Sequence, residues 1–387
     1  RADERDLHMA RPEFEQHIAL FGESGSGKTV LLSSFFGRAQ EPSVINASRR
    51  HLVPESRPQG NKLHSYYLGM KNSATLPPAN RFSWDSYTFD LKLKLDASDG
   101  GGTTDALRLV WHDYPGEWFE GRREGARERE RQTAGFRALL ESDVAFLLVD
   151  GQKLLDHRGE EERYLKYLFT SFRNTLLAMR IDILDDGKRL VEFPRIWFIA
   201  LSKSDLNPDL DVYRFRDLVI EKSADELDLL REVLASFVVA PEALAVGEDF
   251  LMLSSGNFAP GEIHLERRVG LDVIMPIAAM LPFERHIRWA TKMKLPAKVA
   301  DELRRNSKLI GKILAGAASR WPRPVAKAVA LIGPSVIAEL AELAGRKLRD
   351  LNSSAVSRGD LLASTLSQFK IGLEDAEESV TLIRGVS

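Results

Sequence analysis

Cysteine is absent from the 387 residues of this chain. Disulfide bonds and thiolate metal sites are therefore excluded, which fits a reducing compartment. The chain also has no large excess of charge of either sign, because its formal net charge is −2. This net charge gives no indication of a nucleic-acid partner. Residues Arg1–Arg11 are charged and contain no apolar stretch of the kind that a secretory signal needs. We expect a cytoplasmic protein that does not bind nucleic acid.

Long apolar runs are scarce as well. The stretch that comes closest to a membrane span is Val325–Gly345, and it contains Glu339, Glu342 and a Gly333-Pro334 pair near its middle. Acidic groups inside a bilayer are costly, and a glycine-proline pair interrupts a helix. We expect packed helices in this stretch, which leaves peripheral contact with a membrane open but not favoured.

The most informative stretch is Gly22–Thr29, with the sequence GESGSGKT. It satisfies the phosphate-loop pattern G-x-x-x-x-G-K-[ST] at every fixed position. The apolar run at residues 17–21 is typical of a buried strand, and residues 30–36 are typical of a helix. A strand, a glycine-rich loop and a helix together bring backbone N–H groups onto an anion. Gly22 and Ser24 shape the loop, and the residues expected to contact the nucleotide are Gly25, Ser26, Gly27, Lys28, Thr29 and Val30.

Two residues of this loop have distinct expected roles. Lys28 supplies a positive charge to the outer phosphates and is a candidate catalytic residue, and Thr29 offers its hydroxyl to Mg²⁺. A second motif, D-x-x-G at residues 113–116, directly follows a strand. Asp113 would hold Mg²⁺ through water, and the Gly116 N–H would contact the γ-phosphate. The alternative interpretation is a loop whose aspartate caps the next turn.

Two further motifs follow later strands. The run Leu201–Asp205 approximates [NT]-K-x-D, in which Asp205 can accept two hydrogen bonds from guanine and Lys203 can lie along the plane of the base. Adenine presents a poor donor pattern to a carboxylate, so guanine is favoured; a helix cap before Pro208 is the alternative. Ser255–Gly256, after the last strand, can offer a backbone N–H to the guanine carbonyl, although such loops are common.

Strand and helix signals alternate through residues 15–291. The strands are expected at residues 17–21, 88–95, 106–111, 144–149, 196–201 and 250–253, and the helices at 131–140, 160–179, 212–235 and 271–289. The second and third strands flank a turn at 99–102 and should pair antiparallel, whereas the other strands are continuous apolar runs typical of a parallel sheet. The predicted fold is a three-layer α/β P-loop NTPase with a mostly parallel sheet and one antiparallel edge strand. Residues 292–387 show no strand signal and are expected to form a C-terminal all-α extension.

Two segments lie where switch regions are expected in a nucleotide-dependent switch protein, one between the first helix and the second strand and one after the D-x-x-G motif. Residues 38–80 are polar, contain several prolines and show no strong period, which predicts a long loop with at most short elements such as 62–70. Thr75 is the candidate that closes on Mg²⁺ there, with Ser73 and Ser83 as competitors and a solvated loop threonine as the alternative. Residues 120–131 alternate in charge, which indicates a solvated helix. The sharper hypothesis is that one of their arginines reaches the phosphate or that this face docks a regulator.

The order and spacing of the four motifs resemble those of the translation-factor-related (TRAFAC) class of P-loop GTPases. The D-Y-P-G-E-W run at residues 113–118 is similar, more narrowly, to the signature of the bacterial YcjX-like stress-associated GTPases. The resemblance covers about residues 15–290. It implies binding of Mg²⁺ and GTP, slow hydrolysis to GDP and phosphate, and a switch that signals to a protein partner. The partner, which the resemblance does not identify, would contact the switch segments or the C-terminal helices.

Glu117 departs from the small signalling GTPases, which usually place a water-orienting glutamine at this position. An ionised carboxylate only accepts hydrogen bonds, and here it would lie near an anionic phosphate. Glu117 could act as a catalytic base, point away or make hydrolysis slow, and we favour slow hydrolysis. The rival functions are an ATPase or nucleotide kinase with the same loop, and a nucleotide-bound scaffold with negligible turnover.

Overall fold

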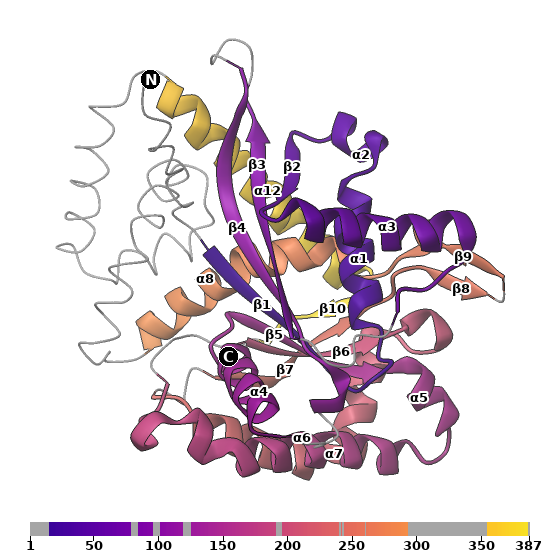
Figure 1. The fold of residues 1–387 in the computed structure, drawn as a ribbon, viewed down its shortest axis with the longest axis vertical. Helices are drawn as coiled ribbons and strands as arrows, with labels where there is room; N and C mark the ends of the chain where they lie inside the picture. Colours follow the sequence, from indigo (N-terminus) through magenta and orange to yellow (C-terminus); the bar gives the residue numbers. More distant parts are fainter. Residues whose placement is uncertain are drawn as a thin grey trace.

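The structure is a computed structural model that describes residues 15–78, 84–95, 101–118, 125–190, 196–239, 241, 244–259, 261–292 and 354–385. These residues form an eight-stranded sheet in the order β10-β7-β6-β5-β1-β4-β3-β2 and a separate hairpin, β8-β9 (Figure 1). The strands of the sheet are β1 (Glu15–Phe21), β2 (Arg50–Pro54), β3 (Asp85–Lys94), β4 (Thr103–Asp113), β5 (Val144–Asp150), β6 (Ile196–Ser202), β7 (Ala245–Met252) and β10 (Leu382–Ile383). The hairpin consists of β8 (Asn257–Ala259) and β9 (Glu262–His264).

Five neighbouring strands, from β7 through β6, β5 and β1 to β4, run parallel. Their carboxyl ends therefore lie along one edge of the sheet, which is where ligands bind in open α/β sheets. Three strands are antiparallel to their neighbours: β3 to β4, β2 to β3, and β10 to β7. The sequence predicts the pairing of β3 with β4 but gives no signal for β2 or β10.

Helices cover both faces of the sheet and complete three layers (Figure 1). On one face, α1 (Lys28–Ala39), α3 (Arg57–Ser73), α8 (Ile274–Lys292) and α12 (Ser354–Glu378) share a core with the sheet. On the other face lie α4 (Gly125–Leu140), α6 (Glu161–Ile183) and α7 (Val212–Ala235). Two short helices, α2 (Pro42–Ala47) and α5 (Gly151–Asp156), lie in connections between larger elements. The predicted three-layer α/β P-loop NTPase fold is confirmed.

The central strands β5 and β6 are buried at every position, because both of their faces are covered by helices. Continuous runs of valine, leucine, isoleucine and phenylalanine are what such strands require. Each strand nevertheless ends on a polar residue, Asp150 in β5 and Ser202 in β6, and both side chains are buried. Buried polar groups at the carboxyl edge mark the part of the sheet in which polar chemistry is concentrated.

The long irregular loop predicted for residues 38–80 is wrong, because the segment contains α2, β2 and α3. Two prolines of the segment, Pro42 and Pro58, occupy the first turns of α2 and α3, where a missing backbone N–H costs nothing. The buried positions of α3 recur at helical spacing, and Tyr67 packs so closely on α1 that an added Cβ at Gly37 would lie 2.2 Å from its ring. The strand β2 is stabilised by its pairing with β3, a long-range contact that the local sequence does not reveal.

The described end of the chain returns to the central sheet. Helix α12 packs along α8, and β10 adds to the edge of the sheet beside β7 (Figure 1). Gly385 contributes a backbone N–H that donates to the buried Asp249 carboxylate at 2.9 Å. The domain boundary near residue 292 stays a prediction, and the stretch Val325–Gly345 lies outside the described residues. Among the helices that the structure describes, none combines the length and apolar character needed to cross a membrane.

We expect Leu382→Ala to lower the free energy of unfolding by about 2–5 kcal/mol, because Leu382 is fully buried in the core shared with α8 and α12. Urea denaturation followed by circular dichroism measures this change. The matched control is Ile371→Ala on α12, whose side chain is 55% exposed and should contribute within about 0.5 kcal/mol. Equal effects of the two substitutions would contradict the docking of β10 on β7.

Candidate functional site

The loop between β1 and α1 wraps around the ammonium group of Lys28. Gly25 and Gly27 adopt left-handed backbone conformations, with φ of 82° and 90°, which glycine tolerates without strain. The Lys28 Nζ donates to the carbonyl oxygens of Gly22 and Glu23, both at 2.8 Å, and lies 3.4 Å from the Ser26 hydroxyl. The lysine therefore fixes the curvature of the loop and is held beneath it.

Burial lowers the pKa of Lys28 to about 8, because removal from water disfavours the charged ammonium. Four nearby carboxylates favour the charged ammonium and so partly offset the effect of burial on the pKa. They belong to Asp113, Glu117, Asp150 and Glu23. A buried lysine at the start of a helix is suited to hold anionic oxygens, since phosphates would strengthen its protonated form.

The strand β4 brings its D-x-x-G motif directly onto the phosphate loop. The Thr29 hydroxyl donates to the Asp113 Oδ2 at 3.2 Å, although the two residues are 84 positions apart. Gly116 approaches so closely that an added Cβ would lie 2.2 Å from the Ser24 backbone nitrogen. Only glycine fits at this position without displacing the loop. The structure therefore brings together Thr29, Asp113 and Gly116, three of the residues chosen from the sequence.

Glu117 follows in a short 3₁₀ turn and is half-buried. Its carboxylate lies close enough to Lys28 to favour the charged form of the lysine, against the larger opposing effect of burial on the pKa. The buried Glu117 Oε2 has no hydrogen-bond partner among the described residues. A buried carboxylate oxygen without a donor is costly in free energy, and such groups are concentrated where a ligand or water completes the site.

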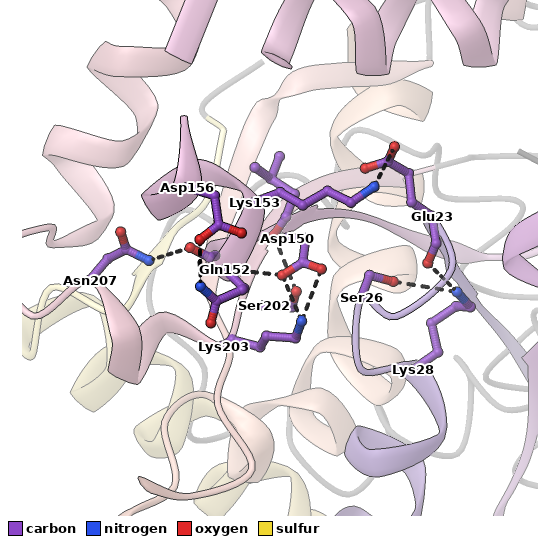
Figure 2. Close-up of polar contacts among 12 residues, drawn as sticks. Glu23, Ser26, Lys28, Asp150, Gln152, Lys153, Asp156, Ser202, Lys203 and Asn207 are labelled. Carbon is purple, nitrogen blue, oxygen red and sulfur yellow. Dashed lines mark hydrogen bonds and ion pairs between the residues drawn. The ribbon is translucent and has the colours of Figure 1, made fainter. Parts of the chain in front are cut away.

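The lysine of the third motif lies beside the phosphate loop. Lys203 has a left-handed backbone with φ of 50°, and its Nζ forms an ion pair with Asp150 at 2.9 Å (Figure 2). An added Cβ at Gly27 would lie 4.0 Å from the Lys203 Cε, so the side chain passes next to the loop. Asp150 also accepts from the Gln152 backbone N–H at 2.9 Å and so caps α5. Its side chain holds Lys203 and the start of α5 in one place.

A second ion pair joins the phosphate loop to α5. Lys153 contacts the Glu23 carboxylate at 3.0 Å, and the Glu23 side chain is only 4% exposed (Figure 2).

Sequence reasoning missed Glu23, Asp150 and Lys153. Asp150 carried a usable signal, because an acidic residue that directly follows a continuous apolar strand lies at the ligand-binding edge of the sheet. Glu23 and Lys153 carried none, since their contact depends on how the fold brings α5 to the loop.

Asp205 lies against the loop that follows β7. Its Oδ1 is 2.7 Å from the Ser254 hydroxyl, and its Oδ2 accepts from the Phe258 backbone N–H at 3.4 Å. The neighbouring Ser255 is buried, and its hydroxyl has no hydrogen-bond partner among the described residues. Gly256 is packed so tightly that an added Cβ would lie 2.5 Å from the His264 carbonyl. The β8–β9 hairpin thus braces the loop that contains Ser255 and Gly256.

The remaining expected contacts have simpler placements. Val30 packs beside a cluster of Tyr67, Met70 and Leu265, between α3 and the β8–β9 hairpin. Thr75 is exposed just after α3, where its hydroxyl donates to the Ser73 carbonyl at 3.1 Å. No contact between Thr75 and the Asp113 carboxylate is present in the described part of the chain, so a metal-binding role for Thr75 stays a prediction. Ser83 lies outside the described residues.

The charged segment predicted at residues 120–131 is described from Gly125 onward, within α4. Arg129 pairs with Asp182 of α6 at 2.7 Å, and Glu128 accepts from the Trp118 indole N–H at 2.8 Å. These contacts tie the start of α4 to the neighbouring helix and to the D-x-x-G turn. Both parts of the sharper hypothesis, a phosphate contact by one of the arginines and a docking face for a regulator, stay predictions.

No protein-family model matches the chain, and no curated protein matches it. Among solved structures, one similar chain is a crystal structure described as nucleolar GTP-binding protein 1 from Plasmodium falciparum. The TM-score is 0.30 and the sequence identity 13%, over 70% of this chain and 89% of that chain. A similarity of this size carries no inference about function. The sheet order and the phosphate loop define the class of the fold, a P-loop NTPase fold, and the function has to be argued from the site.

Proposed function

We propose that the protein is a magnesium-dependent GTPase that binds GTP, hydrolyses it slowly to GDP and phosphate, and acts as a molecular switch. The observation that carries the proposal is the convergence of Thr29 and Asp113 at 3.2 Å, with Lys203 beside the same loop. The motifs proposed to bind the phosphates and the base thus follow strands whose carboxyl ends share one edge of the sheet, which supports the proposal. The proposal extends to a cytoplasmic location and to a kinship with the bacterial YcjX-like GTPases.

The donor set at this edge fits Mg²⁺. A threonine hydroxyl and a buried aspartate carboxylate are hard oxygen ligands, and Mg²⁺ usually takes one or two such groups while phosphates and water complete its shell. Thr29 and Asp113 would hold the ion, which when bound neutralises charge on the outer phosphates. Thr75 is the proposed third residue, and it would exchange its hydrogen bond to Ser73 for the metal site.

The base would be recognised by Asp205 and Lys203. The two oxygens of Asp205 can accept from guanine N1–H and N2–H₂, and both already accept or face protein donors from the loop after β7. Those donors orient the carboxylate toward one side of the loop. Lys203, held by Asp150, can lie along the plane of the base, and the N–H groups of Ser255–Gly256 can donate to the guanine carbonyl. Adenine lacks the paired donors that Asp205 would require.

The phosphate side of the site would respond to the γ-phosphate. Gly116 is packed against Ser24, so a phosphate bound at the loop can contact its N–H and shift the turn that carries Glu117. The segment that follows this turn leads into α4, through which a change at Gly116 would reach a protein partner. The partner surface is proposed to be the switch segments or the C-terminal helices.

The rival with a specific observation in its favour is a nucleotide-bound scaffold with negligible turnover. Glu117 places a carboxylate near Lys28, where it would repel a γ-phosphate. Single-turnover hydrolysis of radiolabelled GTP, compared with the Lys28→Ala variant in the presence of Mg²⁺, distinguishes the two functions. The proposed GTPase requires a wild-type rate clearly above that of Lys28→Ala, and equal rates would favour the scaffold. Faster hydrolysis of ATP than of GTP would favour an ATPase.

We expect GTP affinity to fall as the pH rises through about 8, by up to about tenfold per pH unit. The pKa of Lys28 is lowered to about 8, so the free protein loses this charge above that pH, and bound phosphates would restore it. Binding at pH 9 should therefore take up a proton. Isothermal titration calorimetry in buffers of different ionisation enthalpy measures the uptake. Lys28→Arg should show no such dependence, and a flat wild-type profile between pH 7 and 9.5 would contradict the role of Lys28.

We expect Glu117→Gln to bind GTP about three- to tenfold more tightly and to hydrolyse it at least as fast as the wild type. The reason is that a neutral amide removes about 1 kcal/mol of like-charge repulsion and can orient water by donating and accepting. Fluorescence titration gives the affinity, and quench-flow under single-turnover conditions gives the rate. A rate loss greater than about tenfold would show that the carboxylate acts as a general base.

A further inference from the structure

The turn between α12 and β10 connects the last described helix to the edge of the sheet beside β7 (Figure 1). Two backbone carbonyl groups of this turn accept hydrogen bonds from other elements. The Thr381 carbonyl accepts from the Met252 N–H at 2.9 Å, and the Val380 carbonyl accepts from the Val212 N–H at 3.0 Å. Met252 is the last residue of β7 and Val212 is the first residue of α7, so the turn bridges these two elements.

The two bridged elements adjoin the segments that are proposed to bind the base. Leu253 lies between β7 and Ser254, and its carbonyl accepts from the Ser204 N–H at 3.1 Å. Ser204 begins the short 3₁₀ turn that contains Asp205, and this turn leads into α7. The turn between α12 and β10 therefore holds the ends of both segments that are proposed to contact guanine.

The turn has the hydrogen bonds of a Schellman motif, which commonly ends a helix. The Thr381 N–H donates to the Ala376 carbonyl at 2.9 Å, and the Val380 N–H donates to the Glu377 carbonyl at 3.2 Å. This motif requires a left-handed backbone at the position of Val380, where glycine is usual. Val380 has a φ of 51°, and its side chain is 41% exposed. A β-branched residue in this conformation is strained, and an exposed side chain offsets little of the strain by packing.

Contacts of β10 hold the strained turn in place. Leu382 is fully buried in the core that the sheet shares with α8 and α12. Arg384 forms ion pairs with Glu377 of α12 at 2.5 Å and with Glu284 of α8 at 3.5 Å. Strain that opposes these contacts narrows the free-energy difference between the docked and the detached turn, which is a property of segments that open locally.

We propose that residues 379–383 are a latch that controls the proposed base site. Docked on β7 and α7, the latch holds the segments that contain Asp205 and Ser255 in the arrangement that guanine would require. When the latch detaches, these segments lose their support and the affinity for guanine nucleotides falls. Because binding and docking are linked, a bound guanine nucleotide would strengthen the docking by the same factor. The role of the nucleotide rests on the proposed GTPase function, whereas the docking of the latch does not.

Hydrogen–deuterium exchange at the amides of Val212 and Met252, measured by NMR on the full chain, tests the latch without any nucleotide. Both N–H groups donate to carbonyls of the latch, so both should exchange when it detaches. Val380→Gly removes the strain and should slow both about two- to tenfold. Leu382→Ala weakens the docking and should speed both at least about tenfold. Val53→Gly, at an exposed position of β2 on the opposite edge of the sheet, is the matched control and should leave both rates unchanged.

Fluorescence titration with a GTP analogue tests the link between the latch and the base site. Leu382→Ala should lower the affinity at least about threefold, and adding Val380→Gly to this variant should restore part of it. Inorganic tripolyphosphate, which the phosphate loop alone would hold, should bind the wild type and both variants equally. In the wild type, GTP should slow the exchange of the same two amides.

Three results would overturn the latch. They are unchanged exchange in Val380→Gly, faster exchange at only one of the two amides in Leu382→Ala, and no rescue of GTP affinity in the double variant. Equal losses of GTP and tripolyphosphate affinity would make β10 a general support of the fold and would also overturn it. A wild-type chain that binds no guanine nucleotide would contradict the proposed GTPase instead, and the exchange rates of the two amides would then decide whether the latch detaches as one unit.

Discussion

Asp205→Asn should exchange the nucleotide preference of the protein from guanine to xanthine. GTP affinity should fall at least about a hundredfold, because two hydrogen bonds to a charged acceptor are lost. Xanthosine triphosphate should gain affinity in the same variant, since its C2 carbonyl can accept from the new amide N–H. Competition against a fluorescent guanine nucleotide measures all three affinities, including that of ATP, which should not change.

The exposed Asp209→Asn provides the matched control, because it removes the same charge four residues away without touching the loop after β7. It should leave every affinity unchanged. If Asp205→Asn weakened GTP binding without any gain for xanthosine triphosphate, the residue would be structural, through its contacts with Ser254 and Phe258. Unchanged GTP affinity would show that Asp205 does not contact the base.

Thr29→Val should abolish most of the magnesium dependence of the site while preserving the shape of the side chain. The hydroxyl that now donates to Asp113 is the group expected to hold the ion, and removing it should lower GTP hydrolysis by about a hundredfold or more. A second readout is binding: Mg²⁺ should strengthen GTP affinity in the wild type, relative to EDTA, and have little effect in the variant. Thr29→Ser retains the hydroxyl and should behave nearly as the wild type.

Thr29→Ser is the control that separates loss of the metal ligand from damage to α1. Serine and valine both alter the start of the helix, but only serine keeps the hydroxyl. Thermal denaturation of the three proteins checks that the fold is retained. Full magnesium dependence in Thr29→Val would contradict the assignment of Thr29 and Asp113 as the metal site. It would leave the 3.2 Å contact between them as a feature of packing only.

The sequence predicts the strands and loops at the edge of the sheet where the carboxyl ends of the parallel strands lie. Each of these elements depends on a pattern of neighbouring residues in the sequence. The buried strands β5 and β6 are continuous apolar runs, and the phosphate loop needs glycine at the two positions with left-handed backbone, Gly25 and Gly27. The antiparallel pairing of β3 with β4 follows from alternating residues around a glycine-rich turn. The order of the motifs along the chain was sufficient to predict that Thr29 and Asp113 meet.

The parts that the sequence does not predict depend on contacts between distant segments. The strand β2 pairs with β3 across the segment that contains α3, and β10 reaches β7 from the end of the chain. The ion pairs of Glu23 with Lys153 and of Asp150 with Lys203 join loops whose proximity is set by the fold.

The most direct measurement of the central claim is equilibrium competition of unlabelled nucleotides against a fluorescent GTP analogue on the full chain, with Mg²⁺ and with EDTA. One site is expected, with GTP and GDP far tighter than ATP, stronger binding in Mg²⁺, and loss of binding in Lys28→Ala. ATP that competes as well as GTP would contradict the role assigned to Asp205. No saturable binding of any nucleotide would contradict the assembly of the separate motifs into one pocket.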